Sequence, residues 1–285
     1  MKNILITGAN GQLGNEMRVL SAEHPEYTYF FTDVEELDIC NELAIQDFVK
    51  ANAIHVIVNC AAYTAVDNAE DNIWLCTKLN ADAVGYLAKA AEANGAEFIQ
   101  ISTDYVFDGT AHTPYRETEP TCPNSVYGHT KLMGEQNALT LCTRSMVIRT
   151  AWLYSTFGNN FVKTMIRLGR ERDSLGVIFD QVGTPTYACD LARAIFAAIR
   201  QGVTPGIYHF SNEGVCSWYD FTKAIHRLAG ITTCNVKPLH TSEYPTKAKR
   251  PHYSVLDKSK IKEVYNVEIP YWEASLKECI SKLIF

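Results

Sequence analysis

Short apolar runs alternate with longer segments of helical period through the first half of the chain. The runs are rich in β-branched and aromatic residues, as strands buried on both faces of a sheet are; they cover residues 2–7, 27–32, 55–60, 96–102 and 145–152. Between them, apolar positions three and four apart predict amphipathic helices over residues 14–24, 41–52 and 80–95. This alternation predicts an α/β fold, a Rossmann-type doubly wound parallel sheet with helices on both faces.

The pattern becomes less regular after about residue 155. Helical spacing predicts helices over residues 161–172, 189–202, 217–230 and 271–285, with a proline- and lysine-rich loop over residues 244–253. No repeat or low-complexity tract marks a domain boundary. We therefore expect a dinucleotide-binding domain over residues 1–152 and a smaller mixed α/β lobe, mainly for substrate binding, over residues 153–285. The boundary is soft, and some strands and helices of the second part should return to the first.

The composition excludes several classes of function. A net charge of −6 argues against broad nucleic-acid binding, which needs a basic face. No apolar stretch approaches the roughly 20 residues that span a bilayer, and the apolar run at residues 4–6 stops at once in a glycine turn, unlike a signal peptide. Nine cysteines, scattered without metal-binding spacing, favour free thiols in a reducing cytoplasm. We expect a cytoplasmic protein with a small-molecule ligand, without nucleic acid or membrane.

A glycine turn follows the first predicted strand. Gly8, Gly11 and Gly14 have GxxGxxG spacing; the first permits a tight turn, the second lets the backbone approach a pyrophosphate, and the third allows close helix–strand packing. The helix N-terminus then attracts phosphates. Asp33, after the second strand, can accept hydrogen bonds from ribose hydroxyls, and the lack of an arginine beside it favours NAD over NADP. A solvated strand end is the alternative for Asp33.

Tyr127 stands four residues before Lys131, so the two side chains lie on one face of a helix. A nearby ammonium should lower the phenol pKa toward working pH and make Tyr127 a better proton donor. A surface Tyr/Lys pair is the alternative. Thr103 ends the fourth predicted strand, where ligand clefts of α/β sheets open, although a β-branched residue can also end a strand for structural reasons.

Together, these motifs resemble the extended short-chain dehydrogenase/reductase family. The matching segments are TGANGQLG (7–14), NCAAYTAVDNAE (59–70), LNADAV (79–84), STDYVFDG (102–109), YGHTK (127–131), RTAWLY (149–154), GNNFVKTM (158–165), DQVGTPT (180–186) and RPHYSVLD (250–257). They cover nearly the whole chain. The resemblance implies hydride transfer from NADPH or NADH to C4 of dTDP-4-dehydro-β-L-rhamnose, which gives dTDP-β-L-rhamnose. In that reaction Tyr127 donates the proton, Lys131 adjusts the acidity of this tyrosine, and Thr103 holds the carbonyl oxygen.

The resemblance also implies which residues line the two ligand sites. For the cofactor these are, besides the three glycines and Asp33, the residues Gln12, Leu13, Asp38, Ile39, Ala62, Tyr63, Thr64, Tyr127 and Lys131. For the nucleotide sugar they are Thr103, Asp104, Val66, Trp152 and Arg250, the last as a diphosphate contact.

Several of these assignments have structural alternatives. Asp104 equally fits a loop cap, and Trp152 fits an ordinary core position. Lys247 and Lys249 either share the task of Arg250 or solvate the loop. Asn80 either helps to hold a water that links the lysine to solvent or is a polar helix residue exposed to water.

Other activities of the same family stay open. Tyr105 stands where sugar-nucleotide dehydratases carry a glutamate, which favours carbonyl reduction over elimination. A related epimerase, and a non-catalytic subunit resembling the regulatory subunit of methionine adenosyltransferase, are the alternatives. Some members of the family form dimers in which acidic side chains share Mg²⁺. Glu16 fits one such position, but Cys189 stands where the second carboxylate is expected, with Asp190 directed elsewhere. We therefore predict no metal ligands, which leaves Mg²⁺ doubtful, and either a monomer or a homodimer.

Overall fold

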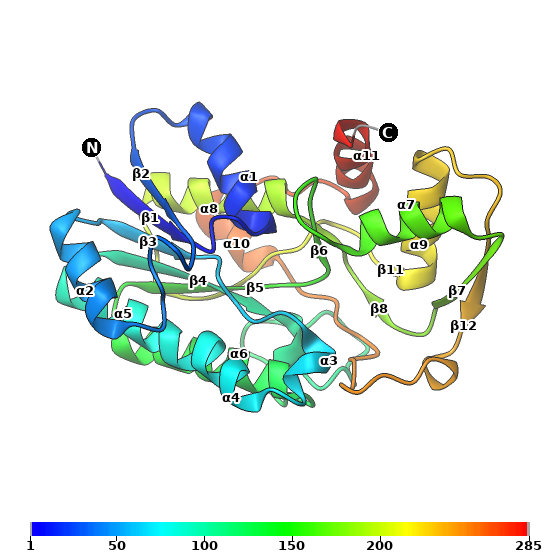
Figure 1. Cartoon of the computed structure of the whole chain (residues 1–285), viewed down its shortest axis with the longest axis horizontal. Coiled ribbons are helices and arrows are strands. Elements are labelled where there is room, and N and C mark those ends of the chain that lie inside the picture. The colour runs from blue at the N-terminus through cyan, green and yellow to red at the C-terminus, as the bar shows by residue number, and fades with distance from the viewer. Residues whose placement is uncertain (1, 284–285) are drawn as a thin grey trace.

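A six-stranded, all-parallel sheet forms the centre of the fold (Figure 1). The structure is a computed structural model, and it describes residues 2–283. The strands lie in the order β10-β5-β4-β3-β1-β2. Their bounds are β1 Asn3–Thr7, β2 Thr28–Thr32, β3 Val56–Asn59, β4 Glu97–Thr103, β5 Ser145–Thr150 and β10 Gly206–His209. Strands β2 and β3 lie on opposite sides of β1, and the carboxyl ends at such a reversal open a ligand crevice.

Helices cover both faces of the sheet because successive strand residues point to opposite sides (Figure 1). Ile4 and Ile6 pack in one apolar cluster while Leu5, between them, packs in another. The helices on the first side are α1 Gln12–Leu20, α8 Ala188–Gln201 and α10 Ser259–Tyr265. Those on the other side are α2 Glu42–Ala51, α5 Ala83–Ala93 and α6 Val126–Leu141. The predicted doubly wound α/β fold is confirmed.

The chain after residue 152 both adds to this sheet and builds a smaller lobe. Strand β10 pairs with β5 and so completes the central sheet. The lobe contains helices α7 Phe161–Glu171, α9 Trp218–Leu228 and α11 Trp272–Lys282. Its short strands are β6 Leu153–Tyr154, β7 Ser174–Ile178, β8 Val182–Gly183, β9 Thr186–Tyr187, β11 Cys216–Ser217 and β12 Asn235–Leu239. These strands pair only two by two, and the hydrophobic pattern did not predict them.

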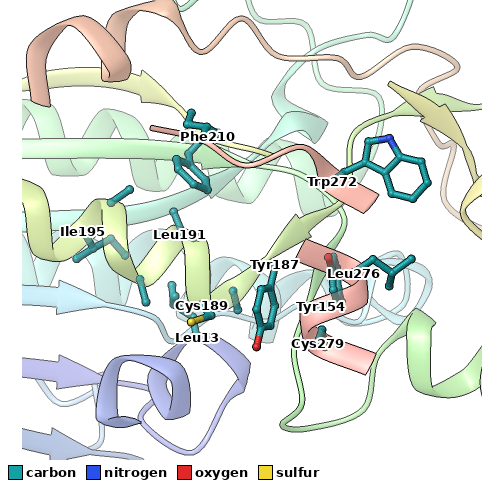
Figure 2. Close-up of a cluster of buried hydrophobic side chains, with 14 of the residues drawn as sticks. Leu13, Tyr154, Tyr187, Cys189, Leu191, Ile195, Phe210, Trp272, Leu276 and Cys279 are labelled. Atoms are coloured by element: carbon teal, nitrogen blue, oxygen red, sulfur yellow. The ribbon is translucent and has the colours of Figure 1, made fainter. Parts of the chain in front are cut away.

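One buried cluster joins the lobe to the helices of the sheet (Figure 2). Tyr154 and Tyr187 stack with ring centroids 5.5 Å apart, and Cys279 and Leu276 of α11 belong to the same cluster as Leu191 of α8. Because aromatic and aliphatic groups from both parts are buried together, moving the lobe would expose apolar surface to water. The cluster therefore fixes the lobe beside the sheet.

Some predicted elements differ in detail. The helix predicted over residues 80–95 begins earlier, as α4 Ile73–Thr77, and passes through a π-helical turn at Lys78–Asp82 before α5. The strand predicted to residue 152 ends at Thr150, since Trp152 has a positive φ of 48°. The last two residues of the helix predicted to end at 285 lie outside the described part. Within residues 2–283, no helix is both long enough and apolar enough to cross a bilayer.

Candidate active site

The glycine turn between β1 and α1 brings backbone segments into close approach. Gly8 has φ +61°, and a Cβ there would lie 2.6 Å from the backbone nitrogen of Ala61. A Cβ on Gly14 would lie 2.5 Å from the Cα of Ala9. Helix α1 begins after Gly11 without a side-chain cap, so its first N–H groups have no side-chain acceptor there. The turn therefore offers uncapped backbone donors next to β3.

A cavity of about 360 Å³ opens beside this turn. Its lining consists of Gly8, Gly11, Asp33, Val34, Leu37, Asp38, Ile39, Cys60, Ala61, Ala62 and Leu79. Asp33 accepts a hydrogen bond from the backbone N–H of Asn10 at 3.0 Å, so its carboxylate is fixed against the glycine turn. The sequence predictions for Asp33, Asp38 and Ile39 thus converge on one cavity.

A second cavity, of about 550 Å³, shares the walls Gly11, Cys60, Ala61 and Ala62 with the first, and the two form one cleft. The predicted residues that line it are Gln12, Leu13, Thr64, Val66, Thr103, Asp104, Tyr127, Lys131 and Trp152. Three predicted residues are not part of either lining, namely Gly14, Tyr63 and Arg250. The cleft therefore runs from the glycine turn to the carboxyl ends of β4 and β5.

Thr103, Tyr127 and Lys131 meet at this end of the cleft. Thr103 is the last residue of β4, while the other two lie one turn apart on α6. The side chain of Ser125 caps α6 by accepting from the backbone N–H of Gly128 at 3.1 Å. The Lys131 ammonium donates to the carbonyl oxygen of Ile101 at 2.6 Å, which anchors the side chain to β4.

Burial dominates the electrostatics of these groups. It raises the pKa of the Tyr127 phenol well above the usual value, against an opposing hydrogen-bond effect of the Thr103 side chain. Burial also lowers the pKa of Lys131 to about 8. The prediction that the neighbouring ammonium lowers the phenol pKa is therefore wrong for this protein, because desolvation of a buried phenolate outweighs such an attraction.

Asp104 is a buried carboxyl in the same wall. Its Oδ1 accepts from the Thr103 hydroxyl at 2.9 Å, whereas its Oδ2 has no hydrogen-bond partner among the described residues. Burial raises its pKa to about 6. The short helical turn Asp104–Val106 is capped instead by the Thr103 side chain, which accepts from the backbone N–H of Tyr105 at 3.2 Å.

Asn80 is buried, so the alternative of a solvent-exposed helix residue is wrong. Its Oδ1 accepts from the backbone N–H of Tyr63 at 2.8 Å, and its Nδ2 donates to the Tyr63 carbonyl at 3.1 Å. These two bonds tie the π-helical turn to the backbone of Tyr63 and so hold residues 60–64 along the cleft.

Trp152 and Arg250 have different surroundings. Trp152 is half-buried and stacks on Trp218 with centroids 3.6 Å apart, while it also lines the cleft. Arg250 donates to both oxygens of Asp67, at 3.1 and 2.7 Å. Asp67 lies in α3, Val66–Ala69, at the rim of the cleft.

Comparison with known proteins agrees with this geometry. The sequence profile of the family described as the RmlD substrate binding domain matches residues 1–285. The chain belongs to this family. It is 41% identical to a dTDP-4-dehydrorhamnose reductase of Aggregatibacter actinomycetemcomitans, covering 97% of this chain and 98% of the relative. The resemblance to extended short-chain reductases, and within them to the RmlD-like proteins, is confirmed.

Two solved structures of RmlD-like proteins superpose closely on the chain. A dTDP-4-dehydrorhamnose reductase of Clostridium acetobutylicum has a TM-score of 0.95 at 47% identity, with 99% of each chain covered. The dTDP-4-dehydrorhamnose reductase of Bacillus anthracis, solved in complex with NADP, has a TM-score of 0.94 at 39% identity, covering 99% of this chain and all of that one.

Some residues of this RmlD-family cleft were not predicted from the sequence. Gly158, Asn159 and Asn160 line it from the lobe. The Asn160 side chain donates to Oε1 of Gln12 at 3.0 Å and caps α7 by accepting from the backbone N–H of Lys163. An asparagine directly before a helical segment is a capping signal, and it marks this position in the sequence.

The positions discussed for a shared Mg²⁺ are buried in this RmlD-family chain. Glu16 accepts from the Ser155 hydroxyl at 2.6 Å, and burial raises its pKa. Cys189 lies in the apolar cluster of α8. Among residues 2–283, no group of three or more His, Cys, Asp or Glu side chains is arranged to hold a metal ion.

Proposed function

We propose that the chain reduces dTDP-4-dehydro-β-L-rhamnose to dTDP-β-L-rhamnose in dTDP-rhamnose biosynthesis, using NADPH or NADH. The observation that carries this proposal is the single cleft in which the glycine turn continues into a wall formed by Thr103, Tyr127 and Lys131. Membership of the RmlD family supports it, because relatives that are 41% and 47% identical to this chain bear the name of this activity.

The residues of the cleft fit a dinucleotide. Any side chain at Gly8 would collide with the backbone of Cys60 and Ala61, directly after β3, so only backbone borders the cavity at this point. The uncapped N-terminus of α1, beginning at Gln12, suits a pyrophosphate, and Asp33 suits ribose hydroxyls. When bound, the reduced nicotinamide supplies a hydride.

The chain's own groups supply the proton and the positive charge. The raised pKa of Tyr127 keeps the phenol protonated at neutral pH, so it is ready to donate to a developing alkoxide. The Thr103 hydroxyl holds the carbonyl oxygen near that phenol. Lys131, anchored on Ile101, is an ammonium below a pH of about 8 and stabilises the negative charge left on the tyrosine.

The substrate side is proposed to be formed by Asp104, Val66 and Trp152, which line the cleft beyond Tyr127, with Arg250 at the rim. The ring of Tyr105 stands edge-on to that of Tyr127, with centroids 5.5 Å apart. It provides no carboxylate base in this position, so the arrangement favours reduction over elimination.

We further propose that the protein works in the cytoplasm as a monomer or homodimer and does not bind nucleic acid. All nine cysteines fall within residues 2–283, and none of them forms a disulfide there, as a reducing compartment favours. The negative net charge of −6 disfavours phosphate backbones as partners.

The decisive experiment incubates the purified protein with dTDP-4-dehydro-β-L-rhamnose and, in parallel, NADPH or NADH. Loss of the reduced-nicotinamide absorbance should accompany formation of dTDP-β-L-rhamnose, identified by mass spectrometry and by comparison with the authentic sugar. No turnover of this sugar, together with turnover of another nucleotide sugar, would overturn the substrate assignment.

A pair of tyrosine variants tests the chemistry. Tyr127→Phe should lower kcat by about 100-fold or more while leaving cofactor affinity within a few-fold. Tyr105→Phe removes a neighbouring phenol and serves as the matched control, with kcat expected to stay within several-fold of the parent. A fully active Tyr127→Phe would remove the proton-donor assignment.

A further inference from the structure

A buried ionic cluster lies directly behind the catalytic wall. Glu135 is only 1% exposed and lies on α6 one turn after Lys131. Its Oε1 accepts from the Ser102 hydroxyl at 2.5 Å and from Nε of Arg149 at 2.9 Å, and its Oε2 accepts from Nη2 of Arg149 at 2.7 Å. Three elements, α6, β4 and β5, thus meet at one carboxylate.

The cluster joins these elements at the point where the reacting groups are placed. Ser102 and Arg149 are register partners on β4 and β5. Three consecutive residues of β4 then have successive tasks: the carbonyl of residue 101 accepts from Lys131, the hydroxyl of Ser102 donates to Glu135, and Thr103 faces the cleft beside Tyr127. A shift of β4 along α6 would break the first two contacts together.

Fold stability alone does not account for such a cluster. Burying an ion pair costs several kcal/mol of desolvation for each ion, and well-packed apolar residues are often as stabilising. Here Nη1 of Arg149 is moreover left without a hydrogen-bond partner among the described residues. A costly, partly unsatisfied charge pair next to a catalytic lysine suggests a task at that lysine.

We propose that Glu135 is a positioning residue of the reductase, which fixes β4 against α6 and supplies a buried negative charge one turn from the Lys131 ammonium. The inference rests on the proposed function for its catalytic meaning. Glu135 touches neither ligand site, and it acts through Ser102 and Lys131.

The charges around Lys131 give the direction of the effect. Burial lowers the Lys131 pKa, while the charge of Glu135 on α6 and the Cys76 thiol on α4 raise it. The other ionisable groups of these elements are Tyr127 and the exposed His129 on α6, Glu97 at the start of β4, Asp104 and Tyr105 after β4, and Arg149 on β5. Without the Glu135 charge, the effect of burial on Lys131 is opposed less, and the Arg149 guanidinium loses its counter-charge. Both changes lower the Lys131 pKa further.

The test compares Glu135→Gln with Asp190→Asn across a pH range that spans 8. Asp190 is the matched control because it too is buried and accepts from a serine, Ser275 at 2.5 Å, and from Arg193 at 3.1 Å, but it lies on α8 and lines neither cavity. In the parent, kcat should fall as the pH rises through about 8. In Glu135→Gln this fall should begin roughly one pH unit lower, with little change in cofactor KM. In Asp190→Asn the pH profile should not move.

Two further measurements keep the outcome clear. If Glu135→Gln does not fold, the doubly neutral Glu135→Gln/Arg149→Met should fold. In this double variant kcat should begin to fall at a lower pH than in the parent, but the shift in pH should be smaller than the shift expected for the loss of the Glu135 charge alone. NMR titration of the Lys131 ammonium in the ligand-free protein reads the charge effect without turnover, so failure of the proposed substrate leaves this arm intact. A parent-like Lys131 titration, or a loss of activity equal at every pH, would assign the cluster to stability alone and overturn the proposal.

Discussion

The wall of the cleft and the loop at its rim are held in place by different kinds of contact. In the wall, Thr103, Tyr127, Lys131 and the Glu135 cluster are all less than a tenth exposed. At the rim, residues 244–253, which we name the strap, are held to α3 and the turn after it by ion pairs of partly or fully exposed groups and by one backbone hydrogen bond from Ala248 to Asp67. In these pairs Arg250 donates to Asp67, and Lys247 contacts Asp71.

This difference matches the tasks that we propose for the two regions, which are proton transfer at the wall and binding of the diphosphate at the strap. Buried polar contacts cannot be exchanged for water without a desolvation cost, so the wall keeps one geometry. Exposed ion pairs contribute about 0–1 kcal/mol each and are readily exchanged. The strap can therefore exchange a protein carboxylate for an anionic ligand, whereas the wall cannot rearrange without losing stability.

The largest effect is expected from a methyl group added to the glycine turn, at the other end of the cleft from the wall. Gly8→Ala should destabilise the fold by about 2–5 kcal/mol, the sum of an unfavourable positive φ (about 1–2 kcal/mol) and overpacking against Ala61 (about 1–3 kcal/mol). Cofactor binding, followed by fluorescence titration, should be largely lost.

Gly230→Ala is the control for that prediction. Gly230 also has a positive φ, of 68°, but a Cβ there would meet nothing within 4 Å. Urea unfolding should therefore show a loss of only about 1–2 kcal/mol, without a change in cofactor affinity. Equal losses in the two variants would mean that the backbone conformation alone, and not the close approach of Ala61, requires glycine at position 8.

Five of the six strands of the sheet were predictable because each lies in a largely apolar run, whereas the short strand β10, Gly206–His209, was not predicted. Both faces of β1, β3, β4 and β5 are buried, which leaves few polar positions to confuse the pattern. The lobe was less predictable since its strands β6, β8, β9 and β11 have two residues each and are too short to show a period.

For the site, local sequence predicted which residues meet but not their electrostatics. The spacing of Tyr127 and Lys131 placed both on one face of α6, and both line the cleft. The direction of the phenol pKa depends on how deeply the pair is buried, and burial is set by tertiary packing. Likewise, Asn160 reaches Gln12 across 148 residues, a contact that no local pattern encodes.

A smaller effect, of opposite sign, is expected at Asp104. Its pKa of about 6 lies above the ordinary value of 3.8, so the folded state prefers the neutral carboxyl. That stabilisation is fully present below about pH 3.8 and is lost as the pH rises through 6. Asp104→Asn should therefore stabilise the protein at neutral pH, by up to about 3 kcal/mol.

The pH dependence of that gain is the check. Urea unfolding of parent and Asp104→Asn should differ most at neutral pH, and the difference should shrink as the pH falls below 6. Reductase activity of the variant should fall, because Asp104 is one of the residues that we propose to form the substrate side of the cleft. A constant difference at all pH values would show that the carboxyl is not the titrating group.

On the strap, Arg250→Met should raise the KM for the nucleotide sugar roughly tenfold with kcat nearly unchanged, as loss of one charge-assisted contact predicts. Thermal stability should change little, since the lost ion pair is partly exposed. Lys247→Met is the control, because it removes one positive charge from the same loop. An equal rise in KM for both variants would indicate that the charge of the strap, not the guanidinium, attracts the diphosphate.

The smallest effect is expected from the partner of Arg250. Asp67 holds both Nη atoms of Arg250 in the ligand-free protein, at 3.1 and 2.7 Å, so it competes with any phosphate for the same donors. Asp67→Asn should therefore lower the KM for the nucleotide sugar by a few-fold at low ionic strength, and added salt should reduce this difference. A higher KM in Asp67→Asn would reverse the argument: the carboxylate would then be the group that positions Arg250 for the substrate, and the rim would be as fixed in its geometry as the wall.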